Sequence, residues 1–219
     1  MSDETTATLR RLPVYLLLDC SGSMAGEPIA AMDMGLKTLI SDLKNDPQAL
    51  ETVWLSVITF ASDVQQIMPL TDVEEFVAPE LVANGATRLG GALELLTRRM
   101  EEEVRTTTPE QKGDWKPLVF ILTDGEPNDE WSEPVKSFRS LGRATVIACG
   151  AGPEVNDDTL KQLGDKIVRL KDTQPGTLGA FMKWVSATVT TASHVIGTKA
   201  GSSQRFAPLP TDEGITVLE

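Results

Sequence analysis

The chain has 219 residues, 41% of them hydrophobic, and its 32 acidic residues outnumber the 20 basic ones to give a formal net charge of −12. This hydrophobic share suits one α/β core and excludes a disordered acidic chain. The acidic balance disfavours nucleic acid and anionic lipid as partners, since both bind clustered Lys and Arg. There is no apolar run near the ~18 residues of a membrane-spanning helix, no signal-peptide pattern and only two cysteines, which predicts a cytoplasmic protein.

Short apolar runs alternate with amphipathic stretches along the chain. The run PVYLLLD, at 13–19, is apolar almost throughout and is typical of a strand buried on both faces. In chain order, strands are predicted at 13–19, 52–60, 64–70, 116–124, 143–149 and 167–170, and helices at 27–45, 88–105, 130–141, 157–163 and 175–194. This alternation predicts a doubly wound α/β fold, with helices on both faces of a mostly parallel sheet.

One domain is expected to account for most of the chain. Residues 1–11 are interpreted as a polar lead-in and residues 12–196 as the domain. From 197 to 219 the sequence is rich in Gly, Ser and Pro, so this tail is predicted to be poorly ordered unless it docks on the domain. The domain is expected to contain six strands in the order 3-2-1-4-5-6, with strand three antiparallel at an edge.

Oxygen-bearing side chains follow two of the predicted strands. A D-x-S-x-S motif, formed by Asp19, Ser21 and Ser23, ends the first strand, and Asp124 ends the strand that should lie beside it. Thr87 lies in a loop before a predicted helix. Because ligands bind at the carboxyl ends of the strands in an open α/β sheet, these five side chains are expected to meet there. Two carboxylates and three hydroxyls, without nitrogen or sulfur, suit Mg²⁺ or Mn²⁺.

These five residues resemble the metal-ion-dependent adhesion site (MIDAS) of von Willebrand factor type A domains. The resemblance implies that Ser21, Ser23 and Thr87 reach the metal directly, while Asp19 and Asp124 act largely through water. Neutral hydroxyl ligands would leave the cation able to accept an acidic side chain from a partner protein. The simpler interpretation is that the two serines cap the following helix and that Asp124 opens a turn.

Longer stretches resemble the bacterial TerY-type proteins of the tellurium-resistance and stress-response group. The resemblance extends to about Val195 and rests on RRLPVYLLLDCSGSM, GEPI, LSVITF, KGDWKPLVFILTDGEPND and FMKWVS. It implies a non-catalytic, partner-binding domain from a family often encoded near a Ser/Thr kinase and a PP2C-like phosphatase. Other tellurium-resistance proteins, or that kinase and phosphatase, are the partners it suggests. Longer relatives carry a zinc ribbon, for which this chain lacks the cysteines.

Other functions remain as alternatives. A scaffold, or a substrate of the kinase and phosphatase, would use loop hydroxyls such as those at 106–108, 202 and 203. A Mg²⁺-dependent phosphoryl-transfer enzyme generally needs a further carboxylate where Ser21 stands and a lysine at a later strand end. A serine hydrolase would need a G-x-S-x-G motif, which is missing. We therefore expect no enzymatic activity.

Several residues near the predicted site allow two interpretations. Glu126, Asn128 and Asp129 follow the segment Thr123-Asp124-Gly125 and either line the rim of the metal site or belong to a solvated turn. Cys20 lies within the first motif and is expected to pack as a small side chain, because thiolate is a poor ligand for Mg²⁺. Trp115 could anchor a partner protein or pack against the domain.

Overall fold

A computed structural model describes residues 10–197, 206–210 and 214–218 of the chain. Each predicted strand and helix is present, with ends that differ by a few residues at most. In chain order the elements are β1 (Leu12–Asp19), a one-turn 3-10 helix (Gly22–Met24), α1 (Glu27–Asn45), α2 (Pro47–Thr52), β2 (Val53–Phe60), β3 (Val64–Asp72), α3 (Leu89–Glu103), β4 (Leu118–Thr123), α4 (Ser132–Leu141), β5 (Thr145–Ala151), α5 (Asp157–Leu163), β6 (Lys166–Leu170), α6 (Pro175–Gly197) and β7 (Ile215–Leu218).

The strands form one sheet in the order β3-β2-β1-β4-β5-β6-β7. β1, β2, β4, β5 and β6 run parallel, whereas β3 and β7 are antiparallel to their neighbours. The predicted order 3-2-1-4-5-6, with its antiparallel edge strand, is confirmed. The predicted number of six strands is corrected to seven by β7, which lies in the tail and whose four residues are too short an apolar run to indicate a strand.

Parts of the tail dock on the domain. Ile215 is buried where β7 pairs with β6, and the Trp184 indole of α6 donates a hydrogen bond to the carbonyl of Ala207 at 3.0 Å. Docking therefore comes from a long-range contact and not from the local composition of the tail. The rest of the tail and most of the predicted lead-in lie outside the described residues, at 198–205, 211–213, 219 and 1–9.

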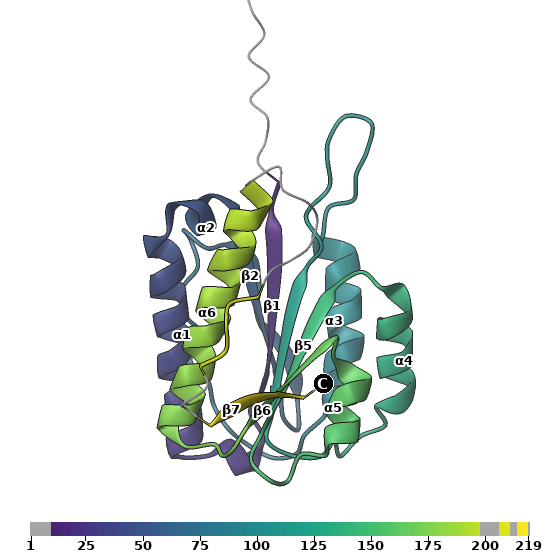
Figure 1. Ribbon diagram of the computed structural model, residues 1–219. Coiled ribbons are helices and arrows are strands. Elements are labelled where there is room, and N and C mark those ends of the chain that lie inside the picture. Colours follow the sequence, from purple (N-terminus) through teal and green to yellow (C-terminus); the bar gives the residue numbers. More distant parts are fainter. Residues whose placement is uncertain (1–9, 198–205, 211–213, 219) are drawn as a thin grey trace, which may run out of the picture.

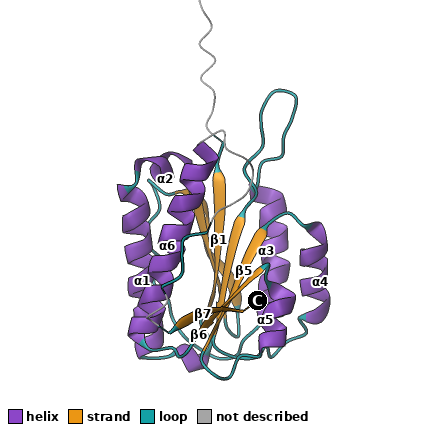
Figure 2. Ribbon diagram, viewed as in Figure 1, coloured by secondary structure: helices purple, strands orange, loops and turns teal. Residues whose placement is uncertain are grey.

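Two layers of helices cover the sheet, with α1, α2 and α6 on one face and α3, α4 and α5 on the other (Figures 1 and 2). In β1, Val14, Leu16 and Leu18 pack into the core under α1 and α6, while Tyr15 and Leu17 pack into the core under α3. All eight residues of β1 are buried. This strand is apolar without alternation because both of its faces are covered.

The short helix α2 was not among the predicted elements. The sequence predicts only the end of a helix near Asn45, but the same residues both end α1 and begin α2. Asp46 accepts a hydrogen bond from the backbone N–H of Ala49 at 2.8 Å, and Pro47 occupies the first helical position. Asp before the helix and Pro at its first position are the residues that favour a helix start.

β1 and β4 bring the predicted site residues to one edge of the sheet. They lie side by side and run parallel, with Leu18 opposite Leu122, so that Asp19 is level with Thr123. The loops that follow both strands lie together at the lower end of the molecule in Figure 1. Neighbouring parallel strands thus place their last side chains next to one another.

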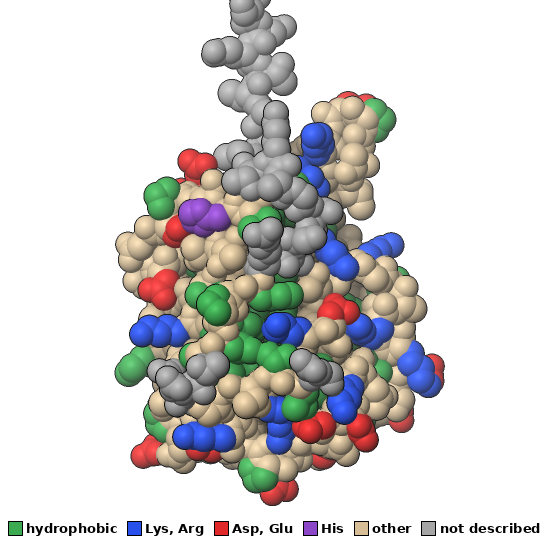
Figure 3. All heavy atoms as spheres, viewed as in Figure 1, with side chains coloured by type: hydrophobic (Ala, Val, Ile, Leu, Met, Phe, Trp, Pro, Cys, Tyr) green, Lys and Arg blue, Asp and Glu red, His purple; other side chains and the backbone are tan. Residues whose placement is uncertain are grey.

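The face of the molecule seen in Figure 3 carries charges of both signs. On the face shown in Figure 3, acidic and basic side chains are interspersed and hydrophobic side chains gather near the middle. This face therefore has no continuous basic patch of the kind that binds nucleic acid.

Within the described part of the chain, no helix has the combination of length and apolar character needed to cross a membrane.

Candidate metal centre

Asp19 is the last residue of β1 and is completely buried. One oxygen of its carboxylate, Oδ1, accepts a hydrogen bond from the backbone N–H of Ser21 at 2.9 Å. The other, Oδ2, accepts one from the hydroxyl of Thr123 at 2.6 Å. Asp19 therefore fixes the start of its own loop and ties that loop to the end of β4. The sequence interpretation gave no role to Thr123, although this residue directly precedes Asp124.

A chain of hydroxyls continues from this loop to Asp124. The hydroxyl oxygens of Ser21 and Ser23 are 3.0 Å apart, and Ser23 donates a hydrogen bond to Oδ1 of Asp124 at 2.8 Å. Ser21 and Asp124 are buried, whereas Ser23 is exposed. Four of the five predicted side chains are therefore brought together, with oxygen atoms that reach from the interior to the surface.

Thr87, the fifth predicted residue, lies in a loop that is fastened to the Asp19 loop. Gly22 donates its N–H to the carbonyl of Gly85 at 3.0 Å, and Asn84 donates its N–H to the carbonyl of Cys20 at 2.7 Å. Gly85 has a φ of +65°, and a Cβ there would lie 1.9 Å from the Ser62 hydroxyl oxygen. Only glycine fits this conformation and this close approach. These contacts place the Thr87 loop against the D-x-S-x-S loop.

The two carboxylates are buried without a positive partner. In the ranges that the structure describes, neither Asp19 nor Asp124 forms an ion pair with Lys, Arg or His. Burial raises the pKa of both carboxyl groups, although hydrogen bonds from Ser21 and Thr123 to Asp19, and from Ser23 to Asp124, act in the opposite direction. Buried carboxylates of this kind are stabilised by a bound cation.

The donor set fits a hard divalent cation. It consists of two carboxylates and three hydroxyls, and oxygen donors are the ligands that Mg²⁺ and Mn²⁺ prefer. Among the described residues no three His, Cys, Asp or Glu side chains cluster in a way that could hold a metal, so the proposed set depends on hydroxyls as well as on its two carboxylates. Cys20 is buried, and burial together with the charge of Asp19 raises the pKa of its thiol to about 12, which keeps it protonated and unsuited to metal binding.

The acidic residues after Asp124 bind the starts of two helices. Both carboxylate oxygens of Asp129 accept backbone N–H groups at the start of α3, from Gly90 at 3.0 Å and Gly91 at 2.9 Å. Glu126 accepts the N–H of Asn156, just before α5, at 2.6 Å. The negative charges of this loop are therefore satisfied by helix N-termini, where carboxylates are favoured. Sequence alone gave no sign of these contacts, because they join segments some 30 to 40 residues apart.

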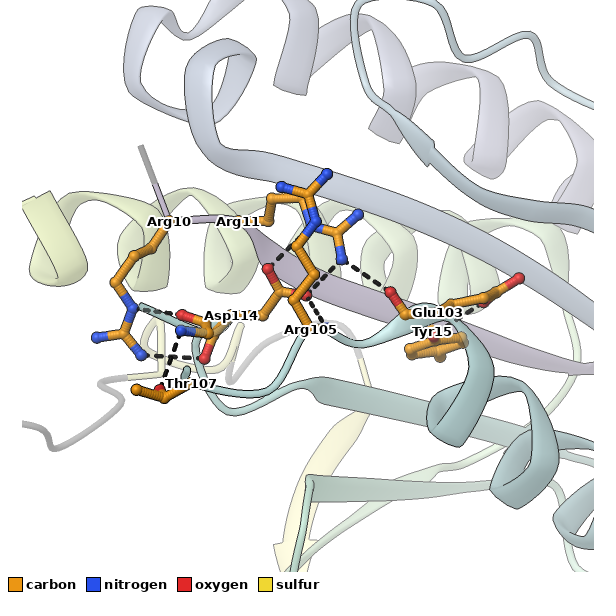
Figure 4. A network of polar contacts seen from close by, with 8 residues as sticks. Arg10, Arg11, Tyr15, Glu103, Arg105, Thr107 and Asp114 are labelled. Atoms are coloured by element: carbon orange, nitrogen blue, oxygen red, sulfur yellow. Dashed lines mark hydrogen bonds and ion pairs between the residues drawn. The ribbon is translucent and has the colours of Figure 1, made fainter. Parts of the chain in front are cut away.

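A second polar cluster lies at the opposite end of the sheet. Arg11 binds the carboxylate of Asp114 through two of its nitrogens, and Tyr15 donates its hydroxyl to Glu103 at 2.9 Å (Figure 4). Burial, with the neighbouring charge of Glu103, raises the pKa of the Tyr15 hydroxyl. Trp115 lies under the guanidinium of Arg10, 3.7 Å from ring centre to Cζ, and so takes part in packing here. The cluster fastens the base of the loop between α3 and β4.

Comparison with known proteins was made by family and by structure. A family model for the von Willebrand factor type A domain matches residues 14–174. The curated protein sequences give no significant match. Similar solved structures include a von Willebrand factor type A protein from Catenulispora acidiphila, with 19% identity, a TM-score of 0.60, and coverage of 83% of this chain and 43% of that one. The likeness at this level of identity establishes the fold.

Two further structures show the same fold in longer proteins. The pilus adhesin SpaC from Lactobacillus rhamnosus GG has 14% identity and a TM-score of 0.63, with coverage of 84% of this chain and 30% of that one. Proximal thread matrix protein 1 from the mussel byssus, described with a zinc-occupied MIDAS motif, has 18% identity and a TM-score of 0.57, with coverage of 81% and 48%. The matched region spans less than half the length of each of these three proteins.

Proposed function

Since a match over residues 14–174 shows that the chain belongs to the von Willebrand factor type A domain family, we propose that it is a metal-dependent protein-interaction module. Domains of this family are typically interaction modules and not enzymes. The observation that carries the proposal is a pair of buried carboxylates, Asp19 and Asp124, that lack a positive partner among the described residues and are connected through Ser21 and Ser23. Mg²⁺ or Mn²⁺ is the proposed ion.

Each of the five side chains has a distinct role in this proposal. Ser21, Ser23 and Thr87 would hold the cation through their hydroxyls, and Asp19 and Asp124 would orient the water around it. When bound, the cation supplies an open position for an Asp or Glu side chain of the partner protein. Three neutral ligands leave much of its positive charge in place, which favours an anionic sixth ligand.

The loop that follows Asp124 is compatible with an acidic partner, although it carries two carboxylates of its own. Glu126 and Asp129 would repel such a partner if their charges faced the site without compensation. Their carboxylates instead accept hydrogen bonds at the starts of α5 and α3. Because backbone N–H groups at these helix ends carry partial positive charge, they offset the two carboxylates.

The same geometry gives little support to phosphoryl-transfer chemistry. Ser21 occupies the place where such an enzyme would carry a further carboxylate. Lys116 precedes β4 and so lies at the opposite end of the sheet, and Lys136 is paired with Glu133 on the exposed surface of α4. With no lysine brought to the site among the described residues, the roles that this chemistry requires are unfilled.

The biological setting is proposed from the resemblance to TerY-type proteins. It would place the chain in the cytoplasm of a bacterium, in tellurium resistance or a related stress response, with an acidic surface of another protein of that system as the partner. A role as a scaffold or substrate of the associated kinase and phosphatase is compatible with this proposal. The hydroxyls at 106–108 are exposed on the loop that projects from the upper end in Figure 1, while 202 and 203 lie outside the described residues.

Calorimetric titration of the EDTA-treated protein with Mg²⁺ and Mn²⁺ tests the proposed site. We expect saturable binding at one site, abolished by Asp19→Ala and weakened by Thr87→Ala. Matched controls are Asp165→Ala, which removes a carboxylate paired with Arg139 at the other end of the sheet, and Thr97→Ala, which removes a hydroxyl bonded to the carbonyl of Leu93 on α3. Wild-type protein that binds neither ion, or Asp19→Ala protein that binds as wild type does, would contradict the proposal.

A further inference from the structure

The loop between β4 and α4, residues 124–131, contacts more of the proposed site than its own carboxylate. Asp124 stands at its start. Four residues later, Asn128 forms two hydrogen bonds with Thr87, which is 41 residues away in the sequence. One loop therefore carries a donor of the proposed site directly and touches a second donor through Asn128.

Thr87 depends on Asn128 for the position of its backbone. The N–H of Thr87 donates to the side-chain oxygen Oδ1 of Asn128 at 2.8 Å, and the N–H of Asn128 donates to the carbonyl of Thr87 at 2.9 Å. Thr87 lies before the start of α3 at Leu89, so no helix or strand bond fixes it. Both of its backbone polar groups are thus held by one residue. With the backbone fixed in this way, the side chain has few directions in which to point.

Asp129, the residue after Asn128, fixes the same loop against the start of α3. Asp129 binds the N–H groups of Gly90 and Gly91 at the first turn of α3 through its two carboxylate oxygens. The backbone of Gly90 also lies close to this loop, since a Cβ at that position would be 2.1 Å from the carbonyl oxygen of Glu130. The two consecutive residues Asn128 and Asp129 therefore clamp the segment 87–91 at both of its ends.

We propose that Asn128 is a positioning residue of the metal centre, which sets the place of the Thr87 hydroxyl relative to Asp124. The proposal rests on the function proposed above, because it requires that Thr87 hold a cation. Groups that orient metal ligands are frequently worth about 10- to 100-fold in metal affinity. Mg²⁺ is sensitive to such placement, since it demands near-ideal octahedral geometry.

A double-mutant cycle on Mg²⁺ affinity tests this role. We expect Asn128→Ala to lower the affinity by about tenfold. In the Thr87→Ala background, where the hydroxyl is already missing, the same substitution should cost almost nothing further, because residues that act together are not additive. Asn128→Asp keeps an oxygen that can accept the Thr87 N–H and should restore the wild-type affinity within a few-fold.

The matched control is Asn156→Ala. Asn156 is also an exposed asparagine whose side chain accepts a backbone N–H, that of Asp158 at 2.8 Å, but it caps α5 and does not touch Thr87. Its loss should leave Mg²⁺ affinity unchanged. Thermal unfolding of every variant in EDTA reports folding separately from binding. If Asn128→Ala does not fold, Asn128→Ser, whose side chain is one atom shorter, takes its place in the cycle.

The outcomes separate this proposal from the one on which it rests. If the wild type binds Mg²⁺ and Asp19→Ala does not, the metal centre stands. Wild-type affinity in Asn128→Ala, an equal loss in the presence and absence of the Thr87 hydroxyl, or no rescue by Asn128→Asp then overturns the positioning role alone. If the wild type binds no Mg²⁺, or Asp19→Ala binds it equally well, the metal centre itself is refuted, and the positioning role with it.

Discussion

Replacing Asp19 by Asn is predicted to stabilise the metal-free protein at neutral pH and to remove its response to Mg²⁺. The Asp19 carboxylate is fully buried, and no positive side chain in the described ranges pairs with it. Asn has the same shape, and its oxygen can still accept the N–H of Ser21. Its NH₂ group can donate to the hydroxyl of Thr123, which in turn has the carbonyl of Gly125 within 3.1 Å as an acceptor. The substitution therefore removes a buried charge without leaving a polar atom unpaired.

Mg²⁺ binding should raise both the free energy of unfolding and the melting temperature of the wild type. At a Mg²⁺ concentration 100 times Kd, binding to one site raises the free energy of unfolding by about 2.7 kcal/mol. In a chain of this size, 1 kcal/mol corresponds to about 2–4 °C, so the melting temperature of the wild type should rise by about 5–11 °C. Asp19→Asn should show no rise. Differential scanning calorimetry in EDTA and in Mg²⁺ gives both quantities from the same samples.

The stability difference between the wild type and Asp19→Asn should change with pH in a direction that can be checked. Burial raises the pKa of Asp19 in the folded state above its usual value of 3.8, so the folded protein binds this proton more tightly than the unfolded chain. The stabilisation that the wild type gains from this tighter proton binding is fully present below pH 3.8 and is lost as the pH rises through the pKa of Asp19 in the folded state. In EDTA the advantage of Asp19→Asn should therefore be largest at neutral pH and shrink toward pH 4. A variant that is less stable than the wild type at pH 7, or that keeps the Mg²⁺ response, refutes this reasoning.

Three further substitutions test other parts of the structure. Gly85→Ala should lower the free energy of unfolding, measured in urea, by more than Gly26→Ala, for which about 1 kcal/mol is expected. Both glycines have positive φ, but only at Gly85 would the new methyl group meet a neighbouring oxygen. Asp114→Ala leaves the buried guanidinium of Arg11 without its carboxylate partner and should cost about 3–5 kcal/mol, while Mg²⁺ affinity stays at the wild-type value. Trp184→Phe removes the hydrogen bond to the docked tail and should speed amide hydrogen exchange in 206–210 and β7, with a cost of about 1 kcal/mol. Unchanged exchange in these segments would contradict the role given to Trp184.

Local patterns in the sequence determined the framework of this protein. Apolar runs such as PVYLLLD and KPLVFILTD predicted strands buried on both faces, and the amphipathic stretches between them predicted the helices that cover those faces. Both signals are local, because burial imposes its period on consecutive residues. The rule that parallel strands end at one edge then predicted that Asp19 and Asp124 would approach one another.

The tertiary structure decided what surrounds these residues. Asn128 reaches Thr87, Asp129 reaches the start of α3, and β7 pairs with β6, all across long separations in the sequence. None of these contacts leaves a periodic trace, because each depends on one side chain or one short strand that meets a backbone group brought close by the fold. Sequence by itself therefore predicted which oxygen-bearing side chains follow neighbouring strands at one edge of the sheet, and only the packing of loops from separate crossovers decided which residues hold each of these side chains in place.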